Sequence, residues 1–252
     1  MAERKLEIAG ADASAEGFLY TPTGSGRSSH EKWPGVLYLT DIWGIRPANQ
    51  AMAQRVATQG YTVLMPNIFY RSDALPIMPP GEPQIGDPAV MRRLSHLLAA
   101  INADQMRRDA RSYAAFLLAL PQVAGPKIAV VGYCFTGQFA LRAAAAAPEL
   151  VAAAASFHGG HLVTEAPDSP HTELPRVAAE LYFGHAVEDQ SMPPAAITKL
   201  DDALKGWGGV WQSELYEGAR HGWSVPGRPV YNEKQSERHF AKLFDLLKRN
   251  LG

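Results

Sequence analysis

The sequence predicts an α/β fold in which a mostly parallel sheet of about eight strands is covered by helices on both faces. Short apolar runs rich in β-branched residues alternate with longer segments of helical periodicity along the 252 residues, and this alternation is typical of parallel sheets. No internal repeat or linker interrupts it. Because α/β folds of this length commonly form one domain, we expect a single domain over residues 1–252.

The expected strands are short apolar segments bounded by turn residues. Residues 5–9 and 17–21 enclose a polar turn, so we expect them to form an antiparallel edge. The remaining strands are expected at residues 35–40, 61–65, 128–131, 151–157, 179–183 and 212–216.

The expected helices separate these strands. Pro47 suits the first turn of a helix that runs to about residue 58 and closes at Gly60. Further helices are expected at residues 89–100, 104–120 and 137–147, after Pro193 and Pro194, and at residues 233–249. A proline-rich loop at about residues 67–88 lies among them. A loop of this length within a compact domain is typically a lid or a binding loop.

Residues 127–147 carry the strongest functional signal. A β-branched strand stops at Gly132, an Ala-rich helix follows Gly137, and Cys134 lies in the turn between them. At a turn of this kind the side chain projects from the sheet above the first amides of the helix, which is a nucleophile's position. The pattern is Gly-x-Ser-x-Gly with Cys in place of Ser and the second glycine one place later.

Other polar residues also follow the expected strands. Asp41, His158, Asp189 and His221 each come shortly after a strand, as Cys134 does. In such sheets, ligands bind beyond the carboxyl ends of the strands. Cys134, Asp189 and His221 follow the chain order nucleophile, acid, histidine, which is the order of α/β-hydrolases. The sequence therefore predicts an α/β-hydrolase fold.

Each of these residue types has a chemical role to fill. The thiolate is the nucleophilic form of cysteine, and a helix N-terminus and a basic neighbour such as His221 favour it. A carboxylate such as Asp189 fixes the tautomer and orientation of that histidine. The oxyanion of an acyl intermediate needs two backbone amides, which we expect from Phe135 and Ile42.

Structural interpretations compete with these roles. A lone cysteine is most often a small buried apolar residue, and Glu188 is an alternative to Asp189. His158, His161 and His185 lack the His-Glu-x-x-His spacing or a comparable one. We therefore predict no metal site, and nothing in the sequence indicates a cofactor.

The amino-acid composition limits which classes of partner and which compartment we expect for the protein. The 24 basic and 25 acidic residues give a net charge of -1, so we expect no nucleic-acid partner. One cysteine excludes an internal disulfide and favours a reducing compartment. The N-terminus is charged, and the Ala-rich tract at 143–155 is broken by Pro148 and too short to span a bilayer. We expect a cytoplasmic protein without a membrane partner, and the oligomeric state is not indicated.

These motifs together resemble the dienelactone hydrolase family, also called carboxymethylenebutenolidases, over nearly the whole chain. The resemblance is carried by Gly132-Tyr133-Cys134 with Gly137, Asp41-Ile42-Trp43-Gly44, Asp189 followed by Pro193, and His221 before an aromatic residue. It implies an α/β-hydrolase fold with a cysteine nucleophile and a triad of Cys134, Asp189 and His221.

The resemblance also implies substrate-binding residues. Asp41 stands where the family has a glutamate beside the thiol. Phe69-Tyr70-Arg71 is similar to a Tyr-x-Arg segment whose arginine binds the carboxylate of the substrate, so Arg71 is expected to do the same. Val225 stands where the family has a second arginine.

We therefore expect a hydrolase that cleaves a small lactone or carboxylic ester of the dienelactone type, bearing an acid group, through an acyl-enzyme at Cys134. Two alternatives remain. The chain could be a non-catalytic binding or sensing module on the same scaffold, or a protein with a redox-responsive thiol.

Overall fold

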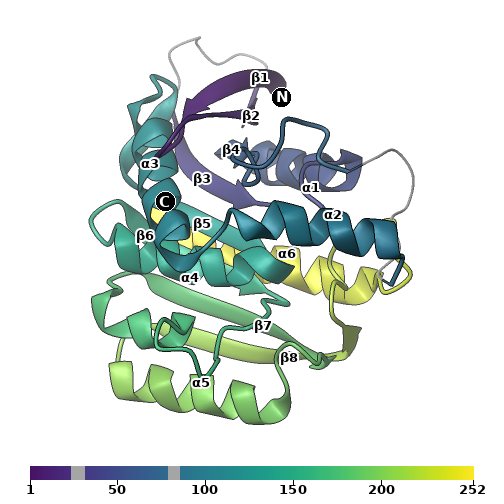
Figure 1. Cartoon of the computed structure of the whole chain (residues 1–252). Coiled ribbons are helices and arrows are strands. Elements are labelled where there is room, and N and C mark those ends of the chain that lie inside the picture. The colour runs from purple at the N-terminus through teal and green to yellow at the C-terminus, as the bar shows by residue number, and fades with distance from the viewer. Residues whose placement is uncertain (24–31, 79–85) are drawn as a thin grey trace.

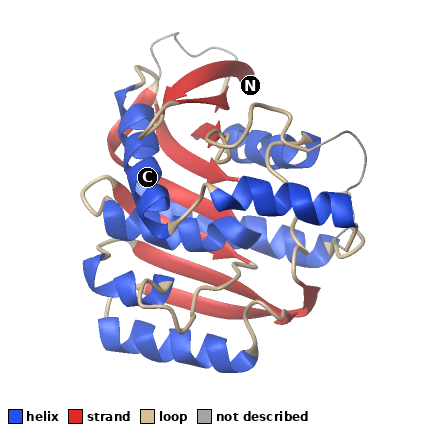
Figure 2. Cartoon of the chain, in the orientation of Figure 1, coloured by secondary structure: helices blue, strands red, loops and turns tan. Residues whose placement is uncertain are grey.

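The computed structural model describes residues 1–23, 32–78 and 86–252, which build one eight-stranded sheet with helices on both faces (Figures 1 and 2). The strands are β1 (Ala2–Ala9), β2 (Ser14–Thr21), β3 (Trp33–Leu39), β4 (Thr62–Pro66), β5 (Val123–Tyr133), β6 (Val151–Phe157), β7 (Glu180–Glu188) and β8 (Trp211–Arg220). Their order in the sheet is β1-β2-β4-β3-β5-β6-β7-β8.

Two strands make this sheet mixed rather than fully parallel. β2 runs antiparallel to both β1 and β4, whereas β4, β3, β5, β6, β7 and β8 pair in parallel. The predicted antiparallel edge and the predicted mostly parallel sheet are both confirmed.

The helices fall near the positions expected from the sequence. They are α1 (Pro47–Thr58), α2 (Pro88–Ala99), α3 (Ala103–Ala119), α4 (Gly137–Ala146), α5 (Pro194–Trp207) and α6 (Glu233–Leu251). Their ends follow local chemistry. Pro47 occupies the first turn of α1, and the side chains of Asn102 and Gln105 form a capping box at the start of α3.

The described part of the chain also forms two short 3₁₀ segments, η1 (Cys134–Thr136) and η2 (Pro170–Arg176). The second lies in the proline-containing stretch between β6 and β7. Pro170 occupies the first turn of η2 and Pro175 its end, and both are compatible with so short a segment.

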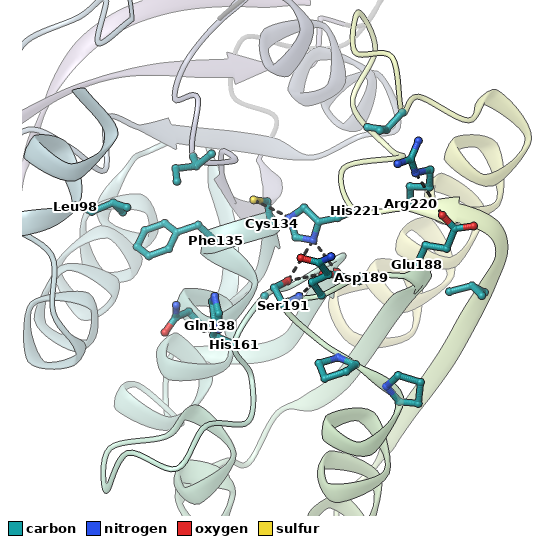
Figure 3. Close-up of a pocket in the computed structure, with 17 residues that line it drawn as sticks. Leu98, Cys134, Phe135, Gln138, His161, Glu188, Asp189, Ser191, Arg220 and His221 are labelled. Carbon is teal, nitrogen blue, oxygen red and sulfur yellow. Dashed lines mark hydrogen bonds and ion pairs between the residues drawn. The ribbon is translucent and has the colours of Figure 1, made fainter. Parts of the chain in front are cut away.

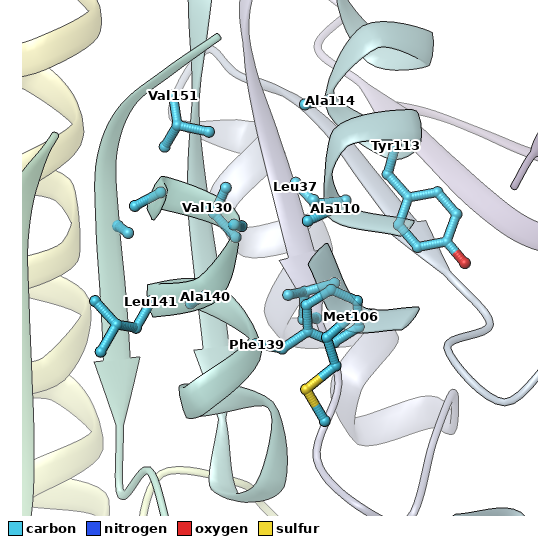
Figure 4. Close-up of a cluster of buried hydrophobic side chains, with 14 of the residues drawn as sticks. Leu37, Met106, Ala110, Tyr113, Ala114, Val130, Phe139, Ala140, Leu141 and Val151 are labelled. Carbon is cyan, nitrogen blue, oxygen red and sulfur yellow. The ribbon is translucent and has the colours of Figure 1, made fainter. Parts of the chain in front are cut away.

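The sheet separates two hydrophobic cores because successive side chains of a strand point to opposite faces. Leu37 and Leu39 of β3 pack with residues of α2, α3, α4 and α5, and Figure 4 shows part of this cluster around Phe139 and Met106. Val36 and Tyr38 face the other way, toward α1 and α6. The inner parallel strands are thus apolar on both faces, whereas the edge strand β8 is mostly half-buried or exposed.

The proline-rich loop expected at residues 67–88 is only partly described, and residues 79–85 lie outside the described part of the chain. Its first half is packed rather than open, since Ile68, Phe69 and Ile77 are buried in the same core as α3. Asn67 organises this turn by accepting from the Phe69 amide at 3.0 Å and donating to the Asp73 carbonyl at 3.0 Å. Within the described residues, no helix is both long and apolar enough to cross a bilayer.

Candidate active site

Cys134 occupies a left-handed turn between β5 and α4. Its φ is +58°, a conformation that non-glycine residues adopt only at an energetic cost and typically at functional sites. The two flanking glycines are required by close packing. A β-carbon at Gly132 would lie 2.1 Å from the Thr136 carbonyl oxygen, and one at Gly137 would lie 2.5 Å from the Cα of Gly159. The second close approach falls at 137 because η1 adds one 3₁₀ turn before α4.

Thr136 closes this turn from within. It is fully buried, and its Oγ1 accepts from the Tyr133 amide at 2.9 Å. The hydroxyl lies 3.0 Å from the carbonyl oxygens of both Leu39 and Tyr133, to either of which it can donate. The side chain of Thr136 therefore ties the end of β5 to the end of β3.

The side chains of Cys134, His221 and Asp189 converge at the C-terminal edge of the sheet (Figure 3). His221 Nε2 lies 3.1 Å from Cys134 Sγ, and His221 Nδ1 lies 2.6 Å from Asp189 Oδ2. Ser191 holds the other oxygen of Asp189, to which its amide and hydroxyl donate at 2.8 and 2.6 Å. Glu188, the alternative acid, instead pairs with Arg220.

The electrostatics of this group favour a charged imidazolium. Burial by itself would lower the pKa of His221, but its hydrogen bonds to Asp189 and Cys134 outweigh burial and raise the pKa to about 10. Burial would likewise raise the pKa of Asp189, yet the contacts with His221 and Ser191 lower it. His221 is therefore suited to hold a proton taken from the thiol.

His158 packs directly behind His221. Its ring meets the His221 ring edge to face at 5.4 Å and the Trp223 ring at 4.9 Å. Its Nε2 lies 2.8 Å from Ser224 Oγ. Burial, followed by repulsion from His221 and His239, holds the pKa of His158 well below its usual range, so His158 is a neutral neighbour.

A cavity of about 930 Å³ opens beside the thiol. Phe135 and Ile42, whose amides were expected to form the oxyanion hole, both line this cavity together with Cys134. A smaller cavity of about 280 Å³ shares Phe135, Gln138 and His161 with the first.

Asp41, which the resemblance placed among the substrate-binding residues, is held by Arg46 and the Trp43 amide. It is 4% exposed, its Oδ2 pairs with Arg46 at 2.7 Å, and its Oδ1 accepts from the Trp43 amide at 3.1 Å. Burial raises the pKa of Asp41 against the opposing effect of Arg46. Asp41 lies outside the residues that line the cavity.

Arg71 is also held elsewhere. Its guanidinium binds Asp109 at 2.6 and 2.8 Å and Asp12 at 2.6 and 2.8 Å, and it stacks over the ring of Tyr70 at 4.5 Å. Asp109 is itself 2% exposed, so it needs this partner. Arg71 does not line the cavity, and the structure therefore gives no support to the expectation that it binds a substrate carboxylate.

The histidines do not form a metal site in the described residues, where no group of three or more potential ligands occurs. His158 and His161 flank Gly159 and Gly160 in left-handed conformations, with φ of +40° and +55°. The Gly160 amide donates to the Cys134 carbonyl at 3.2 Å, and the His161 amide donates to the Ser191 carbonyl at 3.0 Å. This turn therefore joins the nucleophile loop to the acid loop.

Sequence comparison agrees with this architecture. The model of the dienelactone hydrolase family matches residues 15–251. The chain belongs to the dienelactone hydrolase family. Its relatives include a "Putative carboxymethylenebutenolidase" of Synechocystis sp., 26% identical over 238 residues that cover 93% of this chain and 92% of that protein. Hydrolase tropI of Talaromyces stipitatus is 29% identical over 201 residues, covering 77% of this chain and 71% of that protein.

Solved structures of the family share the fold. The crystal structure of a "Putative Dienelactone Hydrolase" from Klebsiella pneumoniae superposes with a TM-score of 0.82 at 17% identity, covering 98% of this chain and 99% of that one. This dienelactone hydrolase family member is thus a carboxymethylenebutenolidase-like hydrolase with an α/β-hydrolase fold.

Sequence reasoning missed the roles of two residues of the site and one contact of a third. Thr136 was visible only as a departure from the glycine expected in the elbow, and Ser191 gave no signal beyond its position two residues after Asp189. His158 was named among the polar residues that follow strands, but its contact with His221 bridges 63 residues of chain, a separation that sequence patterns do not resolve.

Proposed function

We propose that this hydrolase cleaves a lactone or carboxylic ester through a thioester acyl-enzyme at Cys134, with His221 as acid and base and Asp189 as the group that orients His221. The observation that carries the proposal is the position of the His221 ring. One of its nitrogens lies against Cys134 Sγ at 3.1 Å and the other against Asp189 at 2.6 Å.

In the first half of the reaction, the thiol proton passes to His221 Nε2 and the sulfur attacks the carbonyl carbon. The oxyanion accepts hydrogen bonds from the amides of Phe135 and Ile42. When the C–O bond breaks, His221 returns the proton to the departing alkoxide. In a lactone this alcohol stays attached to the acyl group.

In the second half, His221 takes a proton from water, and the hydroxide attacks the thioester carbon. The C–S bond breaks, the acid leaves, and the proton returns to the sulfur. The need for a free thiol suits a reducing compartment such as the cytoplasm.

Replacing Cys134 with Ala tests this proposal. The variant should keep the circular dichroism spectrum and melting temperature of the parent, because the side chain is small and half-buried. Its kcat for p-nitrophenyl esters should fall by at least about 10³-fold, as expected when a nucleophile is removed. Intact-mass measurement of acid-quenched parent should show one added acyl group that the variant lacks.

Turnover by Cys134→Ala at the parent's rate would contradict the proposal. A non-catalytic binding module would bind esters without an initial burst of product. A redox-responsive thiol would react with peroxide far faster than with any ester.

A further inference from the structure

Apolar atoms make up most of the surface of the cavity beside Cys134, and seven of its 17 lining residues are apolar. These are Ile42, Leu98, Phe135, Val187, Pro193, Pro194 and Val230. Figure 3 places Leu98 and Phe135 on one side of the thiol and the Glu188 and Arg220 pair on the other. A volume of about 930 Å³ matches the range of pockets that enclose a small organic molecule.

Among the described residues that line this cavity, Arg220 and His221 each already face a carboxylate. Asp189 and His221 are occupied with each other at 2.6 Å. Arg220 pairs with Glu188 at 3.4 Å, and both side chains are about two-thirds exposed or more, at 66% and 72%. The two carboxylates offset the positive charge of the site.

Neither arginine position implied by the resemblance serves this cavity. Arg71 is bound by Asp12 and the buried Asp109. At the second position stands Val225, which is 1% exposed and belongs to the α6 core.

Two more arginines lie near the elbow, outside the cavity lining. Arg46 pairs with Asp41 at 2.7 Å, and Arg228 stacks over the Trp43 ring at 4.6 Å. Both arginines interact electrostatically with the buried Asp41, which therefore balances part of their charge.

We propose, building on the proposed function, that the substrate is an ester or lactone whose remote part is uncharged and apolar, and that the site discriminates against esters bearing a carboxylate. A carboxylate in this cavity would lose hydration without gaining an unpaired cation, which disfavours its binding. It would also meet Glu188 and Asp189 as like charges. An alkyl or aryl group gains from burial against the same walls.

A matched pair of substrates tests this. p-Nitrophenyl hexanoate and mono-p-nitrophenyl adipate differ at the far carbon, which is a methyl group in one and a carboxylate in the other. We expect the parent enzyme to show a kcat/KM at least about tenfold higher for the hexanoate, equivalent to about 1.4 kcal/mol. The ratio of the two values from one preparation does not depend on how much of the enzyme is folded.

Adding a lysine inside or outside the cavity tests whether the lack of a free cation there causes the substrate preference. Val187 lines the cavity and is 49% exposed, whereas Val210 is 66% exposed and lies outside this cavity. Val187→Lys should narrow the ratio several-fold, and Val210→Lys should leave it unchanged. An equal shift in both variants, or no shift in either, would overturn the claim that a missing cation in the cavity sets the preference.

A parent that prefers the adipate would overturn the proposal. Variants Arg71→Gln, Arg220→Gln, Arg46→Gln and Arg228→Gln would then identify the cation responsible. The proposed function fails separately, if Cys134→Ala hydrolyses either ester at the parent rate. Calorimetric titration of Cys134→Ala with both esters measures the same preference as a ratio of Kd values without turnover, and tighter binding of the adipate would also overturn the inference.

Discussion

The hydroxyl of Thr136 stands where the elbow pattern leads one to expect glycine, and it takes over a structural task there. It binds the backbone at Tyr133 and reaches the Leu39 carbonyl in a buried position. A buried amide or carbonyl that loses its only side-chain partner keeps its desolvation cost without compensation. The turn that holds Cys134 therefore depends on this one hydroxyl.

We expect Thr136→Val, which keeps the shape but removes the hydroxyl, to lower the free energy of unfolding by about 1–3 kcal/mol and to lower kcat. Urea titration and esterase assays measure the two effects. Thr198→Val is the matched control, because the Thr198 hydroxyl donates to the Pro194 carbonyl on an exposed helix face. A loss in Thr136→Val no larger than that of the control would show that Thr136 is dispensable.

At the scale of elements, the buried carboxylate of Glu173 links η2 to α3 and α4 through ion pairs. Glu173 is 1% exposed and pairs with Arg142 of α4, with Arg107 of α3 at 2.8 Å, and with Arg176 at 3.2 Å. Arg142 is 3% exposed and also donates to the Asp168 carbonyl. Removing one partner from such a group leaves a buried charge without compensation.

Glu173→Ala should therefore destabilise the protein by about 3–5 kcal/mol, measured by chemical denaturation. Glu165→Ala removes a carboxylate that is 93% exposed and paired with Lys199, and this control should cost less than about 1 kcal/mol. Similar losses in the two variants would mean that η2 is held by its apolar contacts rather than by Glu173.

At the scale of the whole molecule, buried neutral histidines limit the stability of the fold at low pH, and the charged His221 limits it at high pH. His158, His185 and His239 are buried. Burial lowers the pKa of His185 to about 4 and that of His239 to about 3, against an ordinary value of 6.5. His239 remains neutral while it accepts from the Tyr133 hydroxyl at 3.1 Å. His221 differs, since its pKa is raised to about 10.

Stability should consequently be greatest near pH 6.5. Below that value the unfolded chain binds protons at His185 and His239 that the folded chain excludes, so stability falls toward pH 4. Above it, folded His221 keeps a proton that the unfolded chain loses, so the stability from that charge is lost as pH rises through about 10.

Measuring the free energy of unfolding by chemical denaturation from pH 4.5 to 10 checks both the acid limb and the alkaline limb of this stability profile. His239→Gln should flatten the acid limb and His221→Gln the alkaline limb, while His96→Gln on the exposed face of α2 should change neither. An acid limb unchanged by His239→Gln would contradict this assignment of the buried histidine.

Local sequence patterns predicted the positions of strands and helices closely. The predictions differ from the structure where those patterns end. β7 and β8 extend to Glu188 and Arg220, past the expected ends at residues 183 and 216. Residues 184–188 and 217–220 mix glycine, alanine and charged residues and so lack the continuous apolar run of a strand, and the extension is held by ladder pairing between the two strands. Pairing of this kind depends on a neighbour that lies more than 30 residues away.

The sequence by itself determined the order of elements and that Cys134, Asp189 and His221 follow strands whose ends share one edge, because period, caps and turns are local properties of the chain. Only the tertiary structure decided which charges meet. Arg71 binds Asp12 and Asp109, 59 and 38 residues away, and Asp41 turns to Arg46 rather than to the thiol. Pairing energies depend on distance through space and on burial, and chain order specifies neither.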